Sequence, residues 1–297
     1  MASLPLCLVT PRDRDIFQAL DRCPLTIRQL LKLSALFAYP FTTERRVQER
    51  LQRLCAAGRV RRWTYSTAGR GALSYYTLSP LGFRLLHGGD TAARRGLCEP
   101  VGVARQAHTQ ALAETLVHLQ LGAHAADVPI EEFRRENALR LQVGDASLFP
   151  DAAFVLCPDP ETRYSFFVEI DNRSETVWPG ATPDSWGRKV QFYERLQDAE
   201  DDRFRVLMVT TGSQERLRNM LRCAADAAHN PRRSLVYGIT LADLLRAADP
   251  VAEACFQNHD GQPVALLRGT SLITYTQLTT AQALVPSPAC LRPQPVA

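Results

Sequence analysis

Residues 42–58 read TTERRVQERLQRLCAAG, and residues 59–66 continue as RVRRWTYS. The apolar residues of the first stretch fall at i, i+4, i+7 and i+8, the spacing of one helix face: Val47, Leu51, Leu54 and Cys55. Gly58 stands where the C-terminus of a helix favours a left-handed backbone. The second stretch is rich in β-branched and aromatic residues, which favour a strand. The two stretches therefore predict a helix followed directly by a strand.

The flanking sequence extends this unit on both sides. Upstream, PRDRDIFQALDRC and LTIRQLLKLSAL predict two more helices, the second with Thr26 as its N-cap. Downstream, TAGRG predicts a turn with Arg70 at its tip, ALSYYTLS predicts a second strand, and SPLGFRLL predicts a short helix. Three helices followed by a strand–turn–strand is the order of a winged helix-turn-helix.

Positive charge is concentrated in this part of the chain. Residues 1–100 contain 16 Lys and Arg against 7 Asp and Glu, a net charge of +9, whereas residues 101–297 carry a net charge of −5. A basic unit joined to an acidic one indicates a polyanionic partner for the first. We expect double-stranded DNA, because arginines on a helix can read base edges and neutralise phosphates. The expected DNA-contacting residues are Arg45, Arg46, Gln48, Arg50, Arg59, Arg61, Arg62 and Arg70. The alternatives are a solvated helix face and a protein-docking module.

The rest of the chain has a different order of predicted helices and strands. A helix from residue 103, three strand-like runs, a helix, a strand, a helix, a strand and a short helix give the order αβββαβαβα. We therefore predict an α+β protein of two domains, the second built on an αβββαβ core. The predicted boundaries are a winged-helix domain over 1–87, a linker over 88–102, an α/β domain over 103–274 and a flexible tail over 275–297.

Acidic residues lie at the ends of the predicted strands of this second domain. Asp151 opens one strand, Glu136 ends the preceding one, and Glu169 and Asp171 face the same side of the next strand. Converging carboxylates suit Mg²⁺ or Mn²⁺, and Lys189 at the start of the following helix would orient or deprotonate an attacking water. We expect Asp151, Glu169, Asp171 and Glu136 to bind the metal, and Asp151, Glu169 and Lys189 to be catalytic.

An alternative without a metal remains open. Glu169 and Asp171 would then cap or pair with Arg173 or Arg163 on an exposed strand face. We expect His108, His118 and His124 to be surface residues, because the ten-residue separation of the first two does not suit a shared metal.

Several classes of protein are excluded by composition. No apolar run reaches the roughly 18 residues that a membrane helix needs. The eight cysteines include no CxxC pair, which argues against a zinc site or a disulfide framework and fits a cytoplasmic protein. Gly88-Gly89 is not followed by the GK[ST] of a phosphate-binding loop.

The N-terminal unit resembles the winged helix of the bacterial replication-relaxation family. The similarity continues through Pro150-Asp151-Ala152, the run FVEID at 167–171, Lys189 and Tyr193, and it spans about residues 10–245. The resemblance implies a DNA-binding protein of plasmid or mobile-element replication and maintenance, with replication proteins as partners.

The second domain also resembles the PD-(D/E)xK nuclease core, a restriction-endonuclease-like fold. That pattern implies Asp151 as the first metal acid and Glu169 as the second. Asp171 occupies the place of the pattern's lysine, and Lys189 would supply the amine from the following helix. Two alternative functions follow: a Mg²⁺-dependent DNA endonuclease or nickase, and a winged-helix transcriptional regulator or protein-interaction module.

Overall fold

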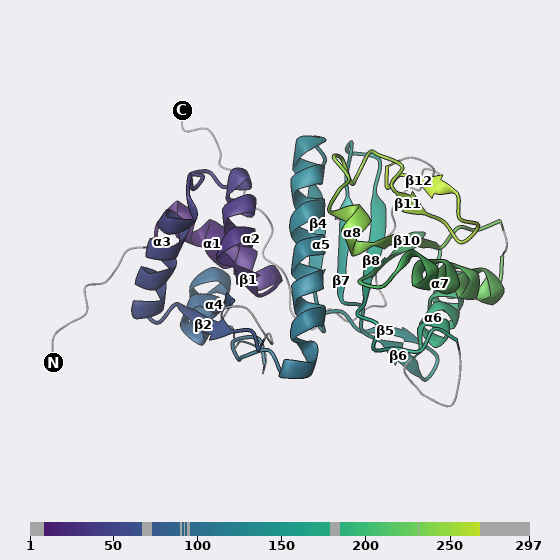
Figure 1. Ribbon diagram of the computed structural model, residues 1–297, viewed down its shortest axis with the longest axis horizontal. Helices are drawn as coiled ribbons and strands as arrows, with labels where there is room; N and C mark the ends of the chain where they lie inside the picture. The colour runs from purple at the N-terminus through teal and green to yellow at the C-terminus, as the bar shows by residue number, and fades with distance from the viewer. Residues whose placement is uncertain are drawn as a thin grey trace.

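The N-terminal part of the chain combines helices with a three-stranded sheet. The computed structural model describes residues 9–66, 73–89, 91, 93, 96–178, 185–230 and 232–267. Within these, the N-terminal elements are α1 (Pro11–Arg22), β1 (Leu25–Thr26), α2 (Ile27–Leu33), the 3-10 helix η1 (Ser34–Leu36), α3 (Glu44–Ala56), β2 (Val60–Thr64), β3 (Ser74–Leu78) and α4 (Pro80–His87). The sheet has the order β1-β3-β2, and Figure 1 shows β2 at the lower side of these helices. The predicted succession of helices and strands is confirmed. Arg70 and the predicted tail over 275–297 lie outside the described residues.

Local sequence signals explain where these helices begin and end. The hydroxyls of Thr10, Thr26 and Thr43 each accept a hydrogen bond from the backbone N–H three residues on, which caps α1, α2 and α3. Gly58 follows α3 with φ +67°, a backbone conformation that side chains with a Cβ rarely adopt. The short segment between α3 and β2 therefore turns sharply, and the helix and the strand lie against one core.

A buried ion pair fixes α3 against α1. Val47 and Leu51 of α3 are fully buried, and Arg50 on a neighbouring face reaches the Asp13 carboxylate with Nε 2.6 Å from Oδ1. Asp13 also accepts hydrogen bonds from the backbone N–H of Thr10 at 2.8 Å and from its hydroxyl at 2.9 Å. Burial opposes ionisation of Asp13, but hydrogen bonds from Arg50 and Thr10 outweigh it and lower its pKa.

A seven-stranded sheet dominates the remainder. The elements of this part of the chain are the 3-10 helix η2 (Val103–Arg105), α5 (Gln106–Ala125), β4 (Ile130–Arg135), β5 (Leu141–Val143), β6 (Ala146–Leu148), β7 (Ala152–Leu156), β8 (Tyr164–Asp171), α6 (Trp186–Ala199), β9 (Phe204–Thr210), α7 (Gln214–Ala227), β10 (Val236–Thr240), α8 (Leu241–Leu244), β11 (Phe256–Gln257) and β12 (Pro263–Val264). The strand order is β12-β11-β10-β9-β8-β7-β4, with β8, β9 and β10 parallel and β7 antiparallel to β8. The predicted αβββαβαβα order is present, and the β5–β6 hairpin and the short strands β11 and β12 are additions to it.

Helices cover both faces of this sheet. Alternate strand residues such as Phe166 and Val168 pack in one apolar cluster with α5, whereas Phe167 and Met208 pack in another with α6 and α7. Figure 1 shows α5 on one side of the strands and α6 and α7 on the other. None of the described helices is both long and apolar enough to cross a membrane.

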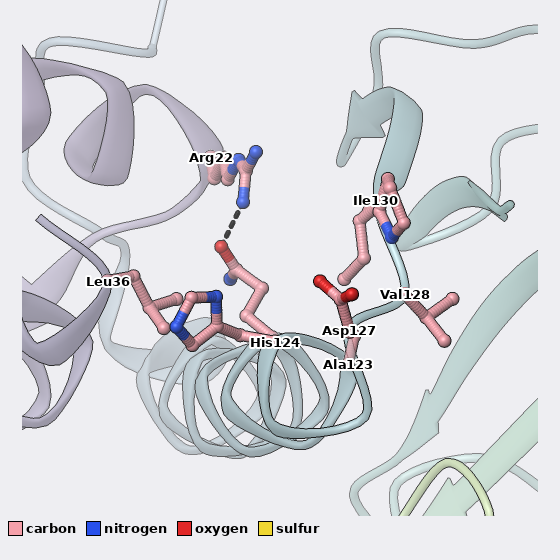
Figure 2. Close-up of a pocket in the computed structure, with 9 residues that line it drawn as sticks. Arg22, Leu36, Ala123, His124, Asp127, Val128 and Ile130 are labelled. Carbon is pink, nitrogen blue, oxygen red and sulfur yellow. Dashed lines mark hydrogen bonds between the residues drawn. The ribbon is translucent and has the colours of Figure 1, made fainter. Parts of the chain in front are cut away.

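Helix α5 also contacts the N-terminal helices, so it lies between them and the sheet (Figure 1). One apolar cluster contains Leu30 of α2 and Leu116 of α5, and Gln29 donates a hydrogen bond to Glu114 at 2.8 Å. A pocket of about 250 Å³ opens at this junction, where Arg22 bonds to Gln120 (Figure 2). The junction is thus packed by apolar and polar contacts, and the domain boundaries themselves stay predictions.

The Asp13–Arg50 pair gives a first testable prediction. We expect Asp13→Asn to lower the free energy of unfolding by about 3 kcal/mol at neutral pH, because it leaves the Arg50 guanidinium without its buried counter-charge. The folded pKa of Asp13 lies below the unfolded value of about 3.9, so its stabilisation is present above that value and is lost as the pH falls through the folded pKa. Urea unfolding of both proteins at neutral and at strongly acidic pH measures the difference, which should shrink in acid.

Glu49→Gln is the matched control. It breaks the exposed Arg45–Glu49 pair on the same helix, where the Arg45 side chain is 87% exposed, and should change stability by less than about 1 kcal/mol. Equal effects of the two substitutions would contradict a structural role for the buried pair.

Candidate functional site

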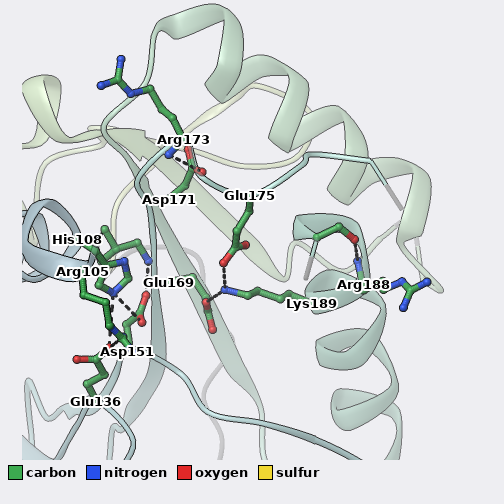
Figure 3. A network of polar contacts seen from close by, with 12 residues as sticks. Arg105, His108, Glu136, Asp151, Glu169, Asp171, Arg173, Glu175, Arg188 and Lys189 are labelled. Carbon is green, nitrogen blue, oxygen red and sulfur yellow. Dashed lines mark hydrogen bonds and ion pairs between the residues drawn. The ribbon is translucent and has the colours of Figure 1, made fainter. Parts of the chain in front are cut away.

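Three potential metal ligands meet at one end of the seven-stranded sheet (Figure 3). His108 lies in the first turn of α5, Glu136 directly follows β4, and Asp151 directly precedes β7. The His108 Nε2 atom is 3.0 Å from Asp151 Oδ1 and 3.8 Å from Glu136 Oε1. One atom from each residue lies within 4.8 Å of the other two, so this group could hold a metal ion.

The chain path explains this convergence. Strand β4 runs antiparallel to β7, so the last residue of β4 lies opposite the first residue of β7, at the same end of the strands. Helix α5 comes just before β4 in the chain and runs in the opposite direction, so the start of α5 lies beside the end of β4. Asp151 is 8% exposed, and its Oδ2 accepts a hydrogen bond from the Ile170 N–H at 2.7 Å, while Oδ1 points to His108.

The donor set suits a divalent cation. An imidazole nitrogen and two carboxylate oxygens are ligands of transition metals, whereas Mg²⁺ prefers oxygen alone. Arg105 pairs with Glu136 Oε1, the oxygen that is 3.8 Å from His108 Nε2, so its guanidinium has to move aside for this oxygen to bind a metal. Mn²⁺ is therefore a better probe of this site than Mg²⁺.

Glu169 lies in a second, more deeply buried polar group. It is 2% exposed, and its carboxylate accepts hydrogen bonds from Lys189 Nζ at 2.9 Å and from the Tyr193 hydroxyl at 2.6 Å. Burial raises the pKa of Glu169 to about 7, Lys189 acts against that shift, and the charge of Asp151 adds to it. Glu169 thus lies close enough to Asp151 for the two carboxylates to influence each other.

Lys189 joins two carboxylates, because its Nζ is also 2.9 Å from Glu175 Oε1. Burial disfavours the charged ammonium, but Glu169 and Glu175 outweigh burial, and the pKa of Lys189 is raised. The ammonium therefore stays charged at neutral pH. Lys189 is suited to holding a negative charge in place and not to accepting a proton.

Asp171 is placed differently from the expected metal ligand. Arg216 Nε and Nη2 donate to its two oxygens, each at 2.6 Å, and the Thr210 hydroxyl donates at 2.5 Å. Burial opposes its ionisation, but these hydrogen bonds from Arg216 and Thr210 prevail and lower its pKa. Both oxygens are occupied, so we leave Asp171 out of the candidate metal site.

The alternative is wrong about the exposed strand face and about Arg163. Glu169 and Asp171 are both buried, and Arg163 pairs instead with Glu131 and Glu132. Of the two expected partners Arg173 does contact Asp171, because its backbone N–H donates to Asp171 Oδ1 at 3.2 Å. The expectation that His108 is a surface residue is also wrong, because only 18% of its side chain is exposed. The sequence did contain a signal that could have placed His108 in this group. In the predicted αβββ order the helix leads into the first strand, so the beginning of the helix is expected beside the end of that strand.

A pocket of about 650 Å³ connects the two polar groups. Its lining includes four cationic side chains, Arg105, Arg188, Lys189 and Arg195, together with His108, Glu136 and Asp151. A pocket that combines cations with a potential metal site is suited to phosphate groups, which both attract.

The predicted DNA-contacting residues divide into two sets. Arg45, Arg46, Gln48, Arg61 and Arg62 are exposed. Arg50 points inward to Asp13, and Arg59 is 8% exposed, so these two guanidiniums are committed to the protein interior.

The Glu169–Lys189 pair yields a pH-dependent prediction. In Lys189→Met the buried Glu169 carboxylate loses its cation, so its folded pKa rises further above the unfolded value of about 4.3. The folded state then retains a proton that the unfolded state releases, and stability relative to wild type falls as the pH rises from about 5 to about 8. Urea unfolding should show a loss near 3 kcal/mol at about pH 8 and a smaller loss at about pH 5.

The control is Arg195→Met, an exposed position on the same helix, for which we expect a change within about 0.5 kcal/mol at both pH values. A loss in Lys189→Met that is independent of pH would show that Lys189 does not stabilise the carboxylate.

Comparison of the chain with curated proteins and with solved structures gave no match. The replication-relaxation family, in contrast, matches residues 21–206, which include α3, β2 and all the residues of both polar groups. This match covers well over half of the 297 residues. The chain therefore belongs to the replication-relaxation family.

Proposed function

We propose that this protein binds duplex DNA through a winged helix formed by α1 to α4 and acts in plasmid or mobile-element replication. The observation that carries the proposal is the set of exposed cationic and amide side chains that α3 and β2 present side by side in the fold. Membership of the replication-relaxation family supports the replication role.

Helix α3 has the features of a recognition helix. Arg45, Arg46 and Gln48 lie in its first two turns on faces that the core leaves exposed, and Arg45 is 87% exposed. An α-helix fits the major groove of B-DNA, where arginine pairs with guanine and glutamine with adenine through two hydrogen bonds. We assign base contacts to these three residues.

Strand β2 supplies phosphate contacts beside the helix. Arg61 donates from Nη1 to the Cys98 carbonyl at 2.9 Å, and Arg62 donates from Nε to the Ser74 hydroxyl at 3.0 Å. Each guanidinium is thereby oriented and still has other N–H groups for a phosphate. Arg50 and Arg59 are removed from the set, because the structure uses them inside the protein.

The proposal predicts a steep salt dependence of DNA binding. Each phosphate contact contributes about −0.9 to the slope of log K against log salt. When Arg45 and Arg62 are both changed to alanine, fluorescence anisotropy on a labelled duplex should therefore give a slope that is less negative by roughly one, because Arg62 contacts a phosphate and Arg45 contacts a base. A change of roughly two would reassign Arg45 to a phosphate contact.

Arg246→Ala is the matched control, since Arg246 is 76% exposed and lies beyond α8, far along the chain from the winged helix. We expect it to leave the slope unchanged. A protein that binds no duplex DNA, or a slope that the double substitution does not alter, would favour the protein-docking alternative.

A second candidate function is metal-dependent cleavage of DNA by a restriction-endonuclease-like second domain. It is favoured by the position of His108, Glu136 and Asp151 in the same pocket as Lys189. These three residues would hold the ion, which would supply Lewis-acid stabilisation of charge on a phosphate. Lys189, held by Glu169 and Glu175, would place its ammonium against the same phosphate.

Metal binding can be tested apart from cleavage. A ligand that binds only the folded state raises its melting temperature, and Mn²⁺ at about a hundred times its Kd should raise it by roughly 5 °C. We expect thermal melts to show this rise in the wild type and its loss in Asp151→Ala and His108→Ala.

His118→Ala serves as the control, because His118 is on the same helix but bonds to the Ala247 carbonyl. Its response to Mn²⁺ should match that of the wild type. Cleavage of a supercoiled plasmid is the further assay, in which Lys189→Ala should be inactive while still responding to Mn²⁺. If the wild type neither responds to Mn²⁺ nor cuts DNA, the second candidate function is excluded.

A further inference from the structure

A hollow of about 590 Å³ lies beside α3, between that helix and the start of α1. We call it the tyrosine hollow, and its lining is Thr10, Pro11, Arg12, Tyr39, Phe41, Arg46, Glu49, Arg50 and Arg53. Arg46 also belongs to the set of proposed base contacts, so the hollow adjoins the surface that we assign to the duplex. Its volume falls in the range of about 300–1,000 Å³ that is usual for small-ligand pockets.

Tyr39 is an unusual residue to find at such a place, because this large aromatic side chain is 57% exposed. Its backbone is held in position, since Arg12 Nε donates to the Tyr39 carbonyl at 2.8 Å. The Arg12 guanidinium in turn lies over the Phe41 ring, 4.7 Å from its centroid. Arg12 thus contacts both the Tyr39 backbone and the Phe41 ring, while the Tyr39 side chain stays open to solvent.

The charge around the hollow is positive. Two of its charged side chains are neutralised locally, because Arg50 pairs with Asp13, and Glu49 pairs with Arg45 at 2.9 Å. Arg46 and Arg53 are exposed on α3, and neither side chain forms an ion pair or hydrogen bond with any part of the chain that the structure describes. An exposed aromatic ring beside available arginines is the combination that binds single-stranded nucleic acid, through base stacking and phosphate contacts.

We propose that the tyrosine hollow binds an unpaired nucleotide adjoining the duplex, with its base stacked on Tyr39 and its phosphate at Arg53, while Arg46 at the rim of the hollow keeps its contact with the neighbouring duplex. This inference rests on the proposed DNA binding and extends it to a preferred DNA structure. The nucleotide has to be unpaired because a base within the duplex is already stacked on both faces and offers no face to the ring. Stacking is also tolerant of base identity, so the preference is for structure more than for sequence.

The test compares two DNA molecules by fluorescence anisotropy: an intact duplex, and the same duplex with an unpaired thymine at its centre. The wild type should bind the bulged duplex about tenfold more tightly, in line with the effect of one base stacked on an aromatic ring. Tyr39→Ala should remove this preference and leave the affinity for the intact duplex unchanged. Tyr39→Phe should keep the preference, because phenylalanine retains the stacking face.

Trp178→Ala is the control for loss of an exposed aromatic residue elsewhere, since Trp178 is 44% exposed in the second part of the chain. It should bind both DNA molecules as the wild type does. Equal affinity of the wild type for the two DNA molecules, or a preference that survives in Tyr39→Ala, overturns the inference while leaving duplex binding intact. A wild type that binds neither DNA molecule overturns the proposed function and this inference together.

Discussion

Strand β8 is covered on both faces, and this burial forces each polar side chain on it to find a partner inside the protein. Its residues from Phe166 to Asp171 are all buried, yet two of the six are carboxylates. An unpaired charge at such a position would destabilise the fold by several kcal/mol. Helices α6 and α7 supply the compensating cations, because both pack on the face of the sheet that these carboxylates occupy.

The two carboxylates consequently acquire different roles. Asp171 is paired with Arg216 and bonded to Thr210 on the adjacent strand, which ties α7 to the sheet. Glu169 is paired with Lys189 near the wall of the pocket, where Asp151 influences its ionisation. The first group is structural, whereas the second places a charged amine beside the candidate metal ligands. The division explains how the strand can carry an acid at position 171, where the nuclease pattern has a lysine. Asp171 is neutralised by Arg216, and the amine beside the candidate metal ligands comes from Lys189 on α6.

A similar division runs through the arginines of the N-terminal part. Arg50 stabilises the packing of α3 on α1, and the same pair leaves Arg46 and Arg53 on either side of it directed to solvent. The Asp13–Arg50 pair fixes the orientation of α3, and that orientation sets where Arg46 and Arg53 face solvent and are available for a ligand. The proposed duplex contacts and the tyrosine hollow both depend on that placement.

The sequence by itself determined the elements and the alternation of their side chains. The stripe of Val47, Leu51 and Leu54 predicted α3, Gly58 predicted its end, and the period of β8 predicted that Glu169 and Asp171 share a face. These features are local, because they depend on residues a few positions apart. Which cation each carboxylate meets is not local: Arg216 lies 45 residues from Asp171, and His108 lies 43 residues from Asp151. Only the packing of α5, α6 and α7 on the sheet decided those pairs, and with them which acids lie in the candidate metal site.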